Sequence, residues 1–343
     1  MQRDRSKVTI YDVARHAGVA ISTVSRVLNE SSDVSDRTRS IVKQAIDDLN
    51  YTPDRTARTL AQQEFHSVAV ALPSFTAPFH NEVLKGIRTA LKEGGLDLLI
   101  SDLGSGNITQ RLRQFLKRGA VDALLICGVP IDDTLAAEIA SIQAPAVLIG
   151  EVHPFFRGYR WNDVAGARDA VTHLVQQGHE RIAMIRASTD SRVQNDRVEG
   201  YRQALADAGL VANPDLIVPG RIDKHAGFSE EDGYDAMQQI LSDLPGVTAV
   251  FASSDVQALG AWSAIVESGL RVPDDMALVG YDDIKTSRYL GLSSVDQSMQ
   301  KIAREATSHL LDELYNRSGS GSRDITTVSP RLNVRRSSQK RRS

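Results

Sequence analysis

The chain has 343 residues, of which 41% are hydrophobic, 24% charged and 5% aromatic. This length exceeds one ordinary hydrophobic core and predicts two or three domains, and the apolar content excludes a wholly disordered chain. The formal net charge of −3 does not by itself indicate a nucleic-acid-binding protein. Residues 1–62 carry ten basic against eight acidic residues, so the charge asymmetry along the chain is also small.

The apolar runs of the sequence are all too short for a membrane span of about 20 residues. The first residues are charged and lack the apolar core of a secretion signal, so we expect a cytoplasmic protein. The single cysteine, Cys127, lies in the apolar run LLICG and is expected to pack in a core without chemistry of its own.

The first fifty residues predict three short helices. Thr9 and Asp12 have the spacing of a capping box, and Gly18 ends the helix that they begin. A second helix follows at once over residues 21–29, and Ser35 is positioned to cap a third. Two helices joined by a tight glycine turn predict a helix-turn-helix, and the alternative at this point is a plain three-helix bundle.

The second helix has two faces of different character. Helical spacing turns Val24, Val27 and Leu28 inward. The opposite face is short, small and basic, and consists of Ile21, Ser22, Ser25 and Arg26.

The runs VTIYDVARHAGVAISTVSRVLN, VSDRTRSIV and LNYTPDRTARTLA closely resemble the DNA-binding headpiece of the lactose-repressor (LacI/GalR) family of bacterial transcriptional regulators. The resemblance is nearly continuous from residue 8 to 61. It implies that some of these side chains face base edges in the major groove and that others lie near phosphates or in the minor groove. The DNA-binding residues implied are Thr9, Ile21, Ser22, Thr23, Ser25, Arg26, Asn29, Arg55, Ala57, Arg58 and Leu60.

The chemistry of the second helix agrees with base recognition. Arg26 can donate two hydrogen bonds to guanine, Ile21 can pack on a thymine methyl group and Ser22 can bond to several bases. Ala20 departs from the family, which usually has a capping serine there, and such a loss costs about 1 kcal/mol in general.

The segment of residues 53–65 is too short to form a stable isolated helix in water, so its simplest interpretation is a linker. The resemblance implies instead a hinge helix that orders on DNA. Leu60 of each protomer would then enter the minor groove at the operator centre, where such a wedge kinks the duplex. Ala57 is small enough for two hinge helices to approach, and Arg55 and Arg58 are available for phosphates.

From residue 68 onward, short β-prone runs alternate with helical stretches, which predicts an α/β core of two parallel sheets. By analogy with the family these are two Rossmann-like lobes of the type I periplasmic-binding-protein-like fold. We expect a headpiece at 1–52, the hinge at 53–65, a core at 66–336 and a basic tail at 337–343. The first lobe would hold 66–162 and 293–325, and the second 163–292 and 326–336.

Such lobes bind ligands where strand carboxyl ends meet helix N-termini. The runs GHERIAMI, NDRVEGYRQAL, AVFASSDVQALGA and ESGLRVPDDMALVGYDD also resemble the family. The effector-contacting residues implied are Phe79, His80, Arg197, Phe228, Ser254, Asp282 and Gln297.

Each of these residues also has a purely structural interpretation. Arg197 and Asp282 suit the hydroxyls of a sugar, or next a nucleoside or nucleobase, and Phe79 and Phe228 suit its ring. However, Asp282 could cap the next segment, Arg197 could be solvated and Phe228 could be core. The run HPFFRGYRWND departs from the commoner family pattern and leaves the effector's identity open.

Catalytic signatures are missing from the sequence. There is no GxGxxG opening a helix, no phosphate-binding GxxxxGK[ST], no GxSxG and no metal-ligand spacing among the histidines, so we expect no enzyme, cofactor or metal. The alternatives are a soluble sugar-binding protein or an α/β enzyme with an accessory DNA-binding domain.

The expected partners are a near-palindromic operator in double-stranded DNA, a small-molecule effector and a second copy of the chain. The C-terminal region shows an SGSGS loop, a strand near 325–328 and the basic run RRSSQKRRS. This run has no leucine heptad, so it predicts a dimer without a zipper-type tetramer. So short a charged terminus predicts a disordered tail, and the alternative is a tail that contacts DNA nonspecifically.

Overall fold

The computed structural model describes residues 8–28, 31, 33–51, 67–92, 95–104, 106–118, 121–221, 227–316 and 323–339. The chain divides into two compact units, residues 1–66 and 67–343, which are described separately. Within the described ranges, no helix is long and apolar enough to cross a membrane.

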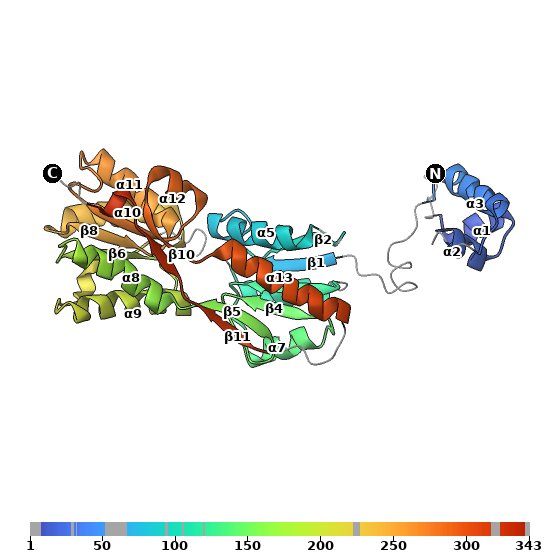
Figure 1. The fold of residues 1–343 in the computed structure, drawn as a ribbon, viewed down its shortest axis with the longest axis horizontal. Helices are drawn as coiled ribbons and strands as arrows, with labels where there is room; N and C mark the ends of the chain where they lie inside the picture. Colours follow the sequence, from blue (N-terminus) through green and yellow to red (C-terminus); the bar gives the residue numbers. More distant parts are fainter. Residues whose placement is uncertain are drawn as a thin grey trace, which may run out of the picture. The chain divides into compact units, whose positions relative to one another are not determined.

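The first unit is a bundle of the three predicted helices, which confirms the prediction (Figure 1). They are α1 (Ile10–Ala17), α2 (Ile21–Leu28) and α3 (Asp36–Asp48). Their apolar stripes meet in a small core that buries Val13, Val24, Val27, Val42 and Ala45.

The ends of these helices have the local structure that their residues predict. The Thr9 hydroxyl and backbone N–H both donate to the Asp12 carboxylate, at 2.6 and 3.0 Å. These bonds lower the pKa of Asp12. Gly18 adopts φ +64°, a left-handed conformation that glycine accepts without strain, and Ser35 accepts the backbone N–H of Thr38 at the start of α3.

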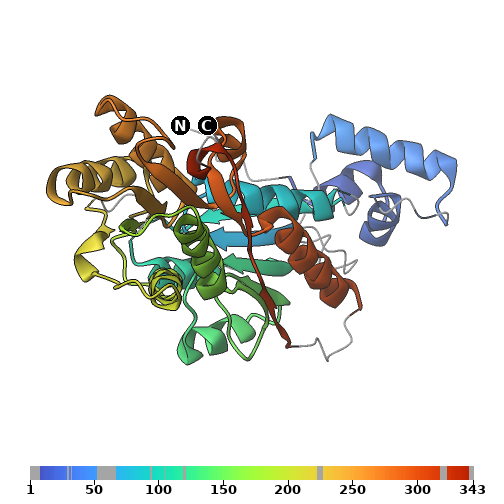
Figure 2. The same ribbon diagram turned by 60° about the vertical axis from the view of Figure 1, so that its left-hand side comes forward.

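The second unit contains two lobes, each built on a sheet with helices on both faces (Figures 1 and 2). The first sheet is parallel and has the strand order β11-β5-β4-β3-β1-β2. Its strands are β1 (Ser67–Leu72), β2 (Asp97–Asp102), β3 (Ala123–Cys127), β4 (Ala146–Ile149), β5 (Arg157–Trp161) and β11 (Ile325–Val328). Helices α5 (Pro78–Leu91) and α13 (Met299–Asn316) pack together, and α6 (Ile108–Lys117) and α7 (Asp133–Ala140) share a separate core with the sheet.

The second sheet has the order β12-β10-β9-β8-β6-β7. Its strands are β6 (Ile182–Arg186), β7 (Ile217–Pro219), β8 (Ala249–Ala252), β9 (Ala277–Asp282), β10 (Ser293–Asp296) and the antiparallel edge strand β12 (Arg331–Asn333). Helices α8 (Asp163–Gln176) and α9 (Arg192–Asp207) cover one face, and α10 (Glu230–Asp243) and α11 (Asp255–Glu267) cover the other. The short helices are η1 (Pro214–Leu216), α12 (Lys285–Leu290) and η3 (Arg336–Ser338).

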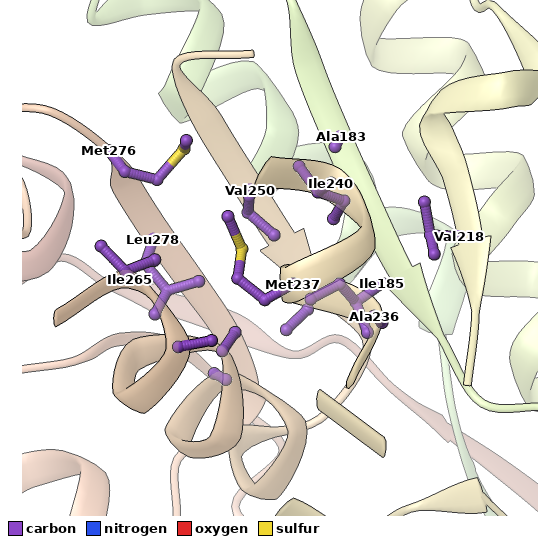
Figure 3. Close-up of a cluster of buried hydrophobic side chains, with 14 of the residues drawn as sticks. Ala183, Ile185, Val218, Ala236, Met237, Ile240, Val250, Ile265, Met276 and Leu278 are labelled. Atoms are coloured by element: carbon purple, nitrogen blue, oxygen red, sulfur yellow. The ribbon is translucent and has the colours of Figure 1, made fainter. Parts of the chain in front are cut away.

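Alternating side chains of the second sheet supply two separate cores, because successive residues of a strand point to opposite faces. Met184 and Phe251 pack against α8 and α9. Ile185 and Val250 pack on the other side with Met237 of α10 (Figure 3). Burial on both faces explains why these strands read as continuous apolar runs without an alternating pattern.

The chain passes between the lobes after β5, after β10 and after β11. Two expected boundaries differ from these crossings. β10 pairs with β9 from Ser293 onward, so the return to the first lobe comes after residue 296 and not at 293. β11 pairs with β5, so residues 326–328 belong to the first lobe and not to the second. The sequence analysis also missed β5 and β12.

The expected disordered tail from residue 337 is wrong for its first residues. Ser337 and Ser338 are buried in η3. The Ser337 hydroxyl donates to the Leu278 carbonyl at 2.6 Å, and Ser338 lies 2.6 Å from the Ser293 hydroxyl. These bonds fasten the C-terminal segment to the second sheet, which a composition-based argument could not show. Residues 340–343 lie outside the described residues.

Met237→Ala should destabilise the second lobe by about 2–5 kcal/mol, because it leaves a cavity in a core that side chains fill from α10, α11 and the sheet. Urea denaturation followed by circular dichroism measures the effect. Val211→Ala is the control, since Val211 is 87% exposed and its truncation should change the free energy of unfolding by less than about 0.5 kcal/mol. Equal effects of the two changes would contradict this description of the core.

Candidate functional site

The outward face of α2 carries the side chains expected to read DNA. Ile21, Ser22 and Arg26 are exposed, and Thr23 and Ser25 are half-buried beside them. Val24 and Val27 anchor the opposite face of the helix in the headpiece core. An exposed isoleucine in so small a domain has no packing role within the described unit, and an arginine one turn along gives the same face a donor for bases or phosphates.

The remaining expected DNA contacts divide into two groups. Thr9 has the capping role that its spacing with Asp12 predicts, at the N-terminus of α1. The others, Asn29, Arg55, Ala57, Arg58 and Leu60, lie outside the described residues, and with them the whole expected hinge.

In the core, the expected effector residues all follow strands. Phe79 and His80 lie in the first turn of α5 after β1, and Arg197 lies in α9 after β6. Phe228 precedes α10, Ser254 caps α11, Asp282 ends β9 and Gln297 follows β10. The strands of each lobe are parallel apart from β12, so these residues gather at the carboxyl edges of the two sheets.

Trp161 joins the two lobes at these edges. It ends β5 in the first lobe, and its indole N–H donates to the Gln297 carbonyl oxygen at 2.7 Å. Its ring packs edge-to-face on Phe79, with ring centroids 5.8 Å apart, and Phe79 meets His80 in the same geometry at 5.3 Å. The result is an aromatic wall on the first lobe, tied directly to a residue that leaves the second.

Asp282 continues this network into the second lobe. It accepts a hydrogen bond of 2.7 Å from the Gln297 side-chain amide. Burial raises its pKa well above the ordinary value, and the positive charge of Arg197 offsets this only in part. Its backbone has φ +111°, a conformation that L-residues rarely adopt and that is common at ligand sites.

Arg197 is held deep in the second lobe, so the alternative of a solvated helix residue is wrong. Its guanidinium lies 3.0 Å from the Asp163 carboxylate, donates to the Ser253 carbonyl and stacks 3.8 Å above the centre of the Tyr281 ring. Removing either member of the Arg197–Asp163 pair would leave a buried charge without its partner.

Ser254 and Phe228 are connected differently. Ser254 accepts the backbone N–H of Gln257 at 3.3 Å and so has a structural role as the N-cap of α11. Phe228 is half-buried beside Ser229, which caps α10. Two surface grooves of about 500 and 460 Å³ contain none of the seven expected residues.

Sequence analysis missed three members of this network, namely Trp161, Asp163 and Tyr281. Trp161 and Asp163 lie where the chain first passes from one lobe to the other, between β5 and α8. The one sequence feature that could have indicated them is a large aromatic residue directly before the Asn-Asp start of a helix. In the described part of the chain, no group of His, Cys, Asp and Glu side chains is arranged to hold a metal ion.

Asp255 supports the site from behind. It is fully buried at the start of α11 and accepts the Ser294 hydroxyl at 2.6 Å and the Ile284 backbone N–H at 2.8 Å. Its carboxylate therefore links α11 to the loop that follows Asp282 and to β10. Burial raises the pKa of Asp255 to about 7.

Both units of the chain match known protein families. Residues 9–54 match the model for bacterial regulatory proteins of the lacI family, and residues 171–338 match that for a periplasmic binding protein-like domain. The transcriptional regulator CelR of Thermobifida fusca is 34% identical over 90% of this chain and 93% of its own. The chain belongs to the lacI family of bacterial regulatory proteins.

Two solved structures of lacI-family regulators resemble the whole chain. A complex of the regulator CelR with cellobiose is 31% identical, with a TM-score of 0.68 over 96% of this chain and 99% of that one. The lac repressor dimer bound to operator and the anti-inducer ONPF is 28% identical, with a TM-score of 0.76 over 98% and 100%. With the exposed face of α2, this establishes a DNA-binding regulator of transcription with a two-lobed core. The relatives named here are regulators and not enzymes.

Asp255→Asn should flatten the pH dependence of stability between about pH 4 and 7. The folded protein keeps the Asp255 proton up to a pH near 7, whereas the unfolded chain releases it near 3.8. Unfolding in this range therefore releases a proton, and the free energy of unfolding falls as the pH rises. Urea denaturation at pH 4.5, 6.0 and 7.5 measures the slope. The exposed Asp235→Asn is the control, and equal slopes for all three proteins would contradict the buried, protonated Asp255.

Proposed function

We propose that this protein is a repressor whose operator affinity is controlled by a small polar effector bound between the lobes of its core. The observation that carries the proposal is that an exposed face on α2, with Ile21, Ser22 and Arg26, occurs in one chain with a core in which Trp161 and Gln297 connect the two sheet edges. In this proposal the protein binds DNA and an effector and carries out no catalysis, so it needs no cofactor. It acts in the cytoplasm, where the DNA lies.

The α2 face would lie in the major groove, with Arg26 on a guanine and Ile21 on a thymine methyl group. Two headpieces would read the two halves of a near-palindrome, and a hinge at residues 53–65 would form only on DNA. Leu60 of each hinge would then enter the minor groove at the centre of the operator.

We propose a sugar or sugar derivative as the effector, with a nucleoside or nucleobase as the next candidate. Phe79 and Trp161 provide an apolar wall, and Asp282 provides an acceptor and, when protonated, a donor for hydroxyl groups. The CelR–cellobiose complex, which has the same fold, supports this class of ligand. His80, Arg197, Phe228, Ser254 and Gln297 complete the proposed site.

A homodimer fits the exposed edge of the first lobe. β2 is an edge strand, and its Leu99 and Ile100 side chains are 44% and 48% exposed. The groove of about 460 Å³ runs between β2, α5 and the N-terminus of α12, and Tyr289 of α12 is 79% exposed. A second copy packed here would cover the strand edge and these apolar side chains, as isologous dimers do. The lac repressor structure is that of a dimer, which supports a dimeric state for this chain.

The test of the whole proposal is selection of bound sequences from a random duplex library at one fixed salt concentration, because affinity for DNA depends steeply on salt. Enrichment of a palindrome supports the proposal, and a central pyrimidine–purine step supports the Leu60 wedge. Repeating the selection with cellobiose, other sugars and nucleosides identifies the effector by the change in enrichment. Failure to enrich any sequence with or without these compounds would refute the proposal.

Arg26→Ala should weaken binding to the selected operator by about 1–3 kcal/mol, while binding to random duplex changes far less, because a bidentate contact to guanine contributes this much discrimination. Fluorescence anisotropy with both duplexes measures the two affinities. Lys43→Ala removes the same charge from the exposed face of α3 and serves as the control. Equal losses on both duplexes for Arg26→Ala would show that Arg26 contacts phosphate only.

Ile100→Asp should convert the dimer to monomers, because it places a charge on the apolar edge that the second copy covers. Sedimentation velocity measures the shift and circular dichroism checks the fold. Val211→Asp introduces the same charge at a residue that is 87% exposed, and it should remain dimeric. A dimer that persists in the Ile100 variant would place the interface elsewhere.

A further inference from the structure

A direct ionic contact links the lobes beside the proposed effector site. Arg192 is the first residue of α9, in the second lobe, and Glu151 follows β4, in the first. The guanidinium Nε lies 3.4 Å from the Glu151 carboxylate, and Nη2 donates to the Gly150 carbonyl oxygen at 2.9 Å. Arg192 therefore binds both a charge and a backbone acceptor across the boundary between the lobes.

The same guanidinium has a second carboxylate partner in its own helix. Nη1 lies 2.7 Å from Asp196, one turn further along α9. This second pair lies within α9 and does not cross the boundary between the lobes. The side chains of Arg192, Glu151 and Asp196 are 33%, 21% and 32% exposed, so solvent reaches all three.

The residue that supplies the backbone acceptor of Arg192 lies next to the aromatic wall. Gly150 adopts φ +90°, and a Cβ on it would lie 3.7 Å from the Trp161 ring. The Trp161 indole in turn donates to the Gln297 carbonyl, and the Gln297 amide donates to Asp282. Gly150, whose carbonyl oxygen accepts from Arg192, therefore lies next to Trp161, the residue that joins the two sheet edges.

We propose that Arg192, Glu151 and the Gly150 carbonyl form an interlobe latch that stabilises the lobe arrangement seen here. The role of this latch in regulation rests on the proposed function. An effector that displaces Trp161 moves Gly150 and so strengthens or releases the contact of Arg192 with the first lobe. A partly exposed ion pair shifts a two-state equilibrium by up to about fivefold. This modest size suits a switch, because a ligand with ordinary differential affinity for the two states can overcome it.

The matched variants are Glu151→Gln and Asp196→Asn, because each removes one carboxylate from the same arginine. The first acts across the lobe boundary, and the second acts within α9 alone. Spin labels at Ala140→Cys in α7 and Ala206→Cys in α9, both exposed, report the interlobe distance by double electron–electron resonance. Burial raises the pKa of the native Cys127 to about 12, so that thiol stays unlabelled. Labelled full-length chains are diluted into an excess of unlabelled protein, so that distances within one chain dominate.

The latch predicts that Glu151→Gln shifts or broadens the interlobe distance distribution and that Asp196→Asn leaves it unchanged. Raising the salt from 0.15 to 1 M should reproduce the Glu151 effect in the parent protein and add little in the variant, because it screens the pair. An unchanged distribution in Glu151→Gln, or equal changes in both variants, would overturn the latch. These distances require no DNA. If the duplex library yields no operator, the proposed function fails, but the interlobe distances still test the latch.

When an operator is available, its affinity gives a second readout. Glu151→Gln should change operator affinity by up to about fivefold. Arg168→Gln breaks an ion pair of 2.7 Å between α8 and α9 inside the second lobe, and should leave operator affinity unchanged. A shift in the interlobe distance without any change in operator affinity would refute the regulatory part of the inference alone.

Discussion

The hydrogen bond from the Trp161 indole to the Gln297 carbonyl ties the carboxyl edges of the two sheets together beside the proposed effector site. Both residues lie at crossings, where a strand of one lobe ends and the chain enters the other. The indole N–H is buried, so it requires an acceptor, and the nearest available one belongs to the neighbouring crossing. Phe79 packs on Trp161, and Asp282 accepts a hydrogen bond from the Gln297 amide.

A second constraint is the burial of several charged groups in the second lobe. Arg197, Asp163, Asp255 and Asp282 are all nearly inaccessible to solvent. Such groups are stable only when they are paired or protonated, and here Arg197 pairs with Asp163 while the pKa values of Asp255 and Asp282 are raised. These bonds connect α8, α9 and α11 to the carboxyl edge of the second sheet. The ion pair of Arg192 is different, because solvent reaches it and its strength is correspondingly small.

The two units place different demands on the chain. The headpiece has a very small core, and the outward side chains of α2 remain exposed. The second unit has two larger sheets, whose helices bury both faces. A regulator needs both, since one surface reads DNA and the other senses a ligand, and the coupling between them is a difference in free energy between lobe arrangements.

The sequence by itself determined the features that depend on local patterns. Helix caps at Thr9 and Ser35, the left-handed turn at Gly18 and the apolar period of α2 are set by neighbouring residues, and so are the β-prone runs of the core. The tertiary structure decided what depends on residues far apart in the chain. Short polar or mixed strands such as β5 and β12 form because a sheet edge is available to pair with them. Likewise, Ser337 and Ser338 of the basic C-terminal run are buried because their hydroxyls find partners at Leu278 and Ser293. The roles of Trp161 and Arg192 follow from the same rule, because their partners lie 136 and 41 residues away and no local pattern indicates them.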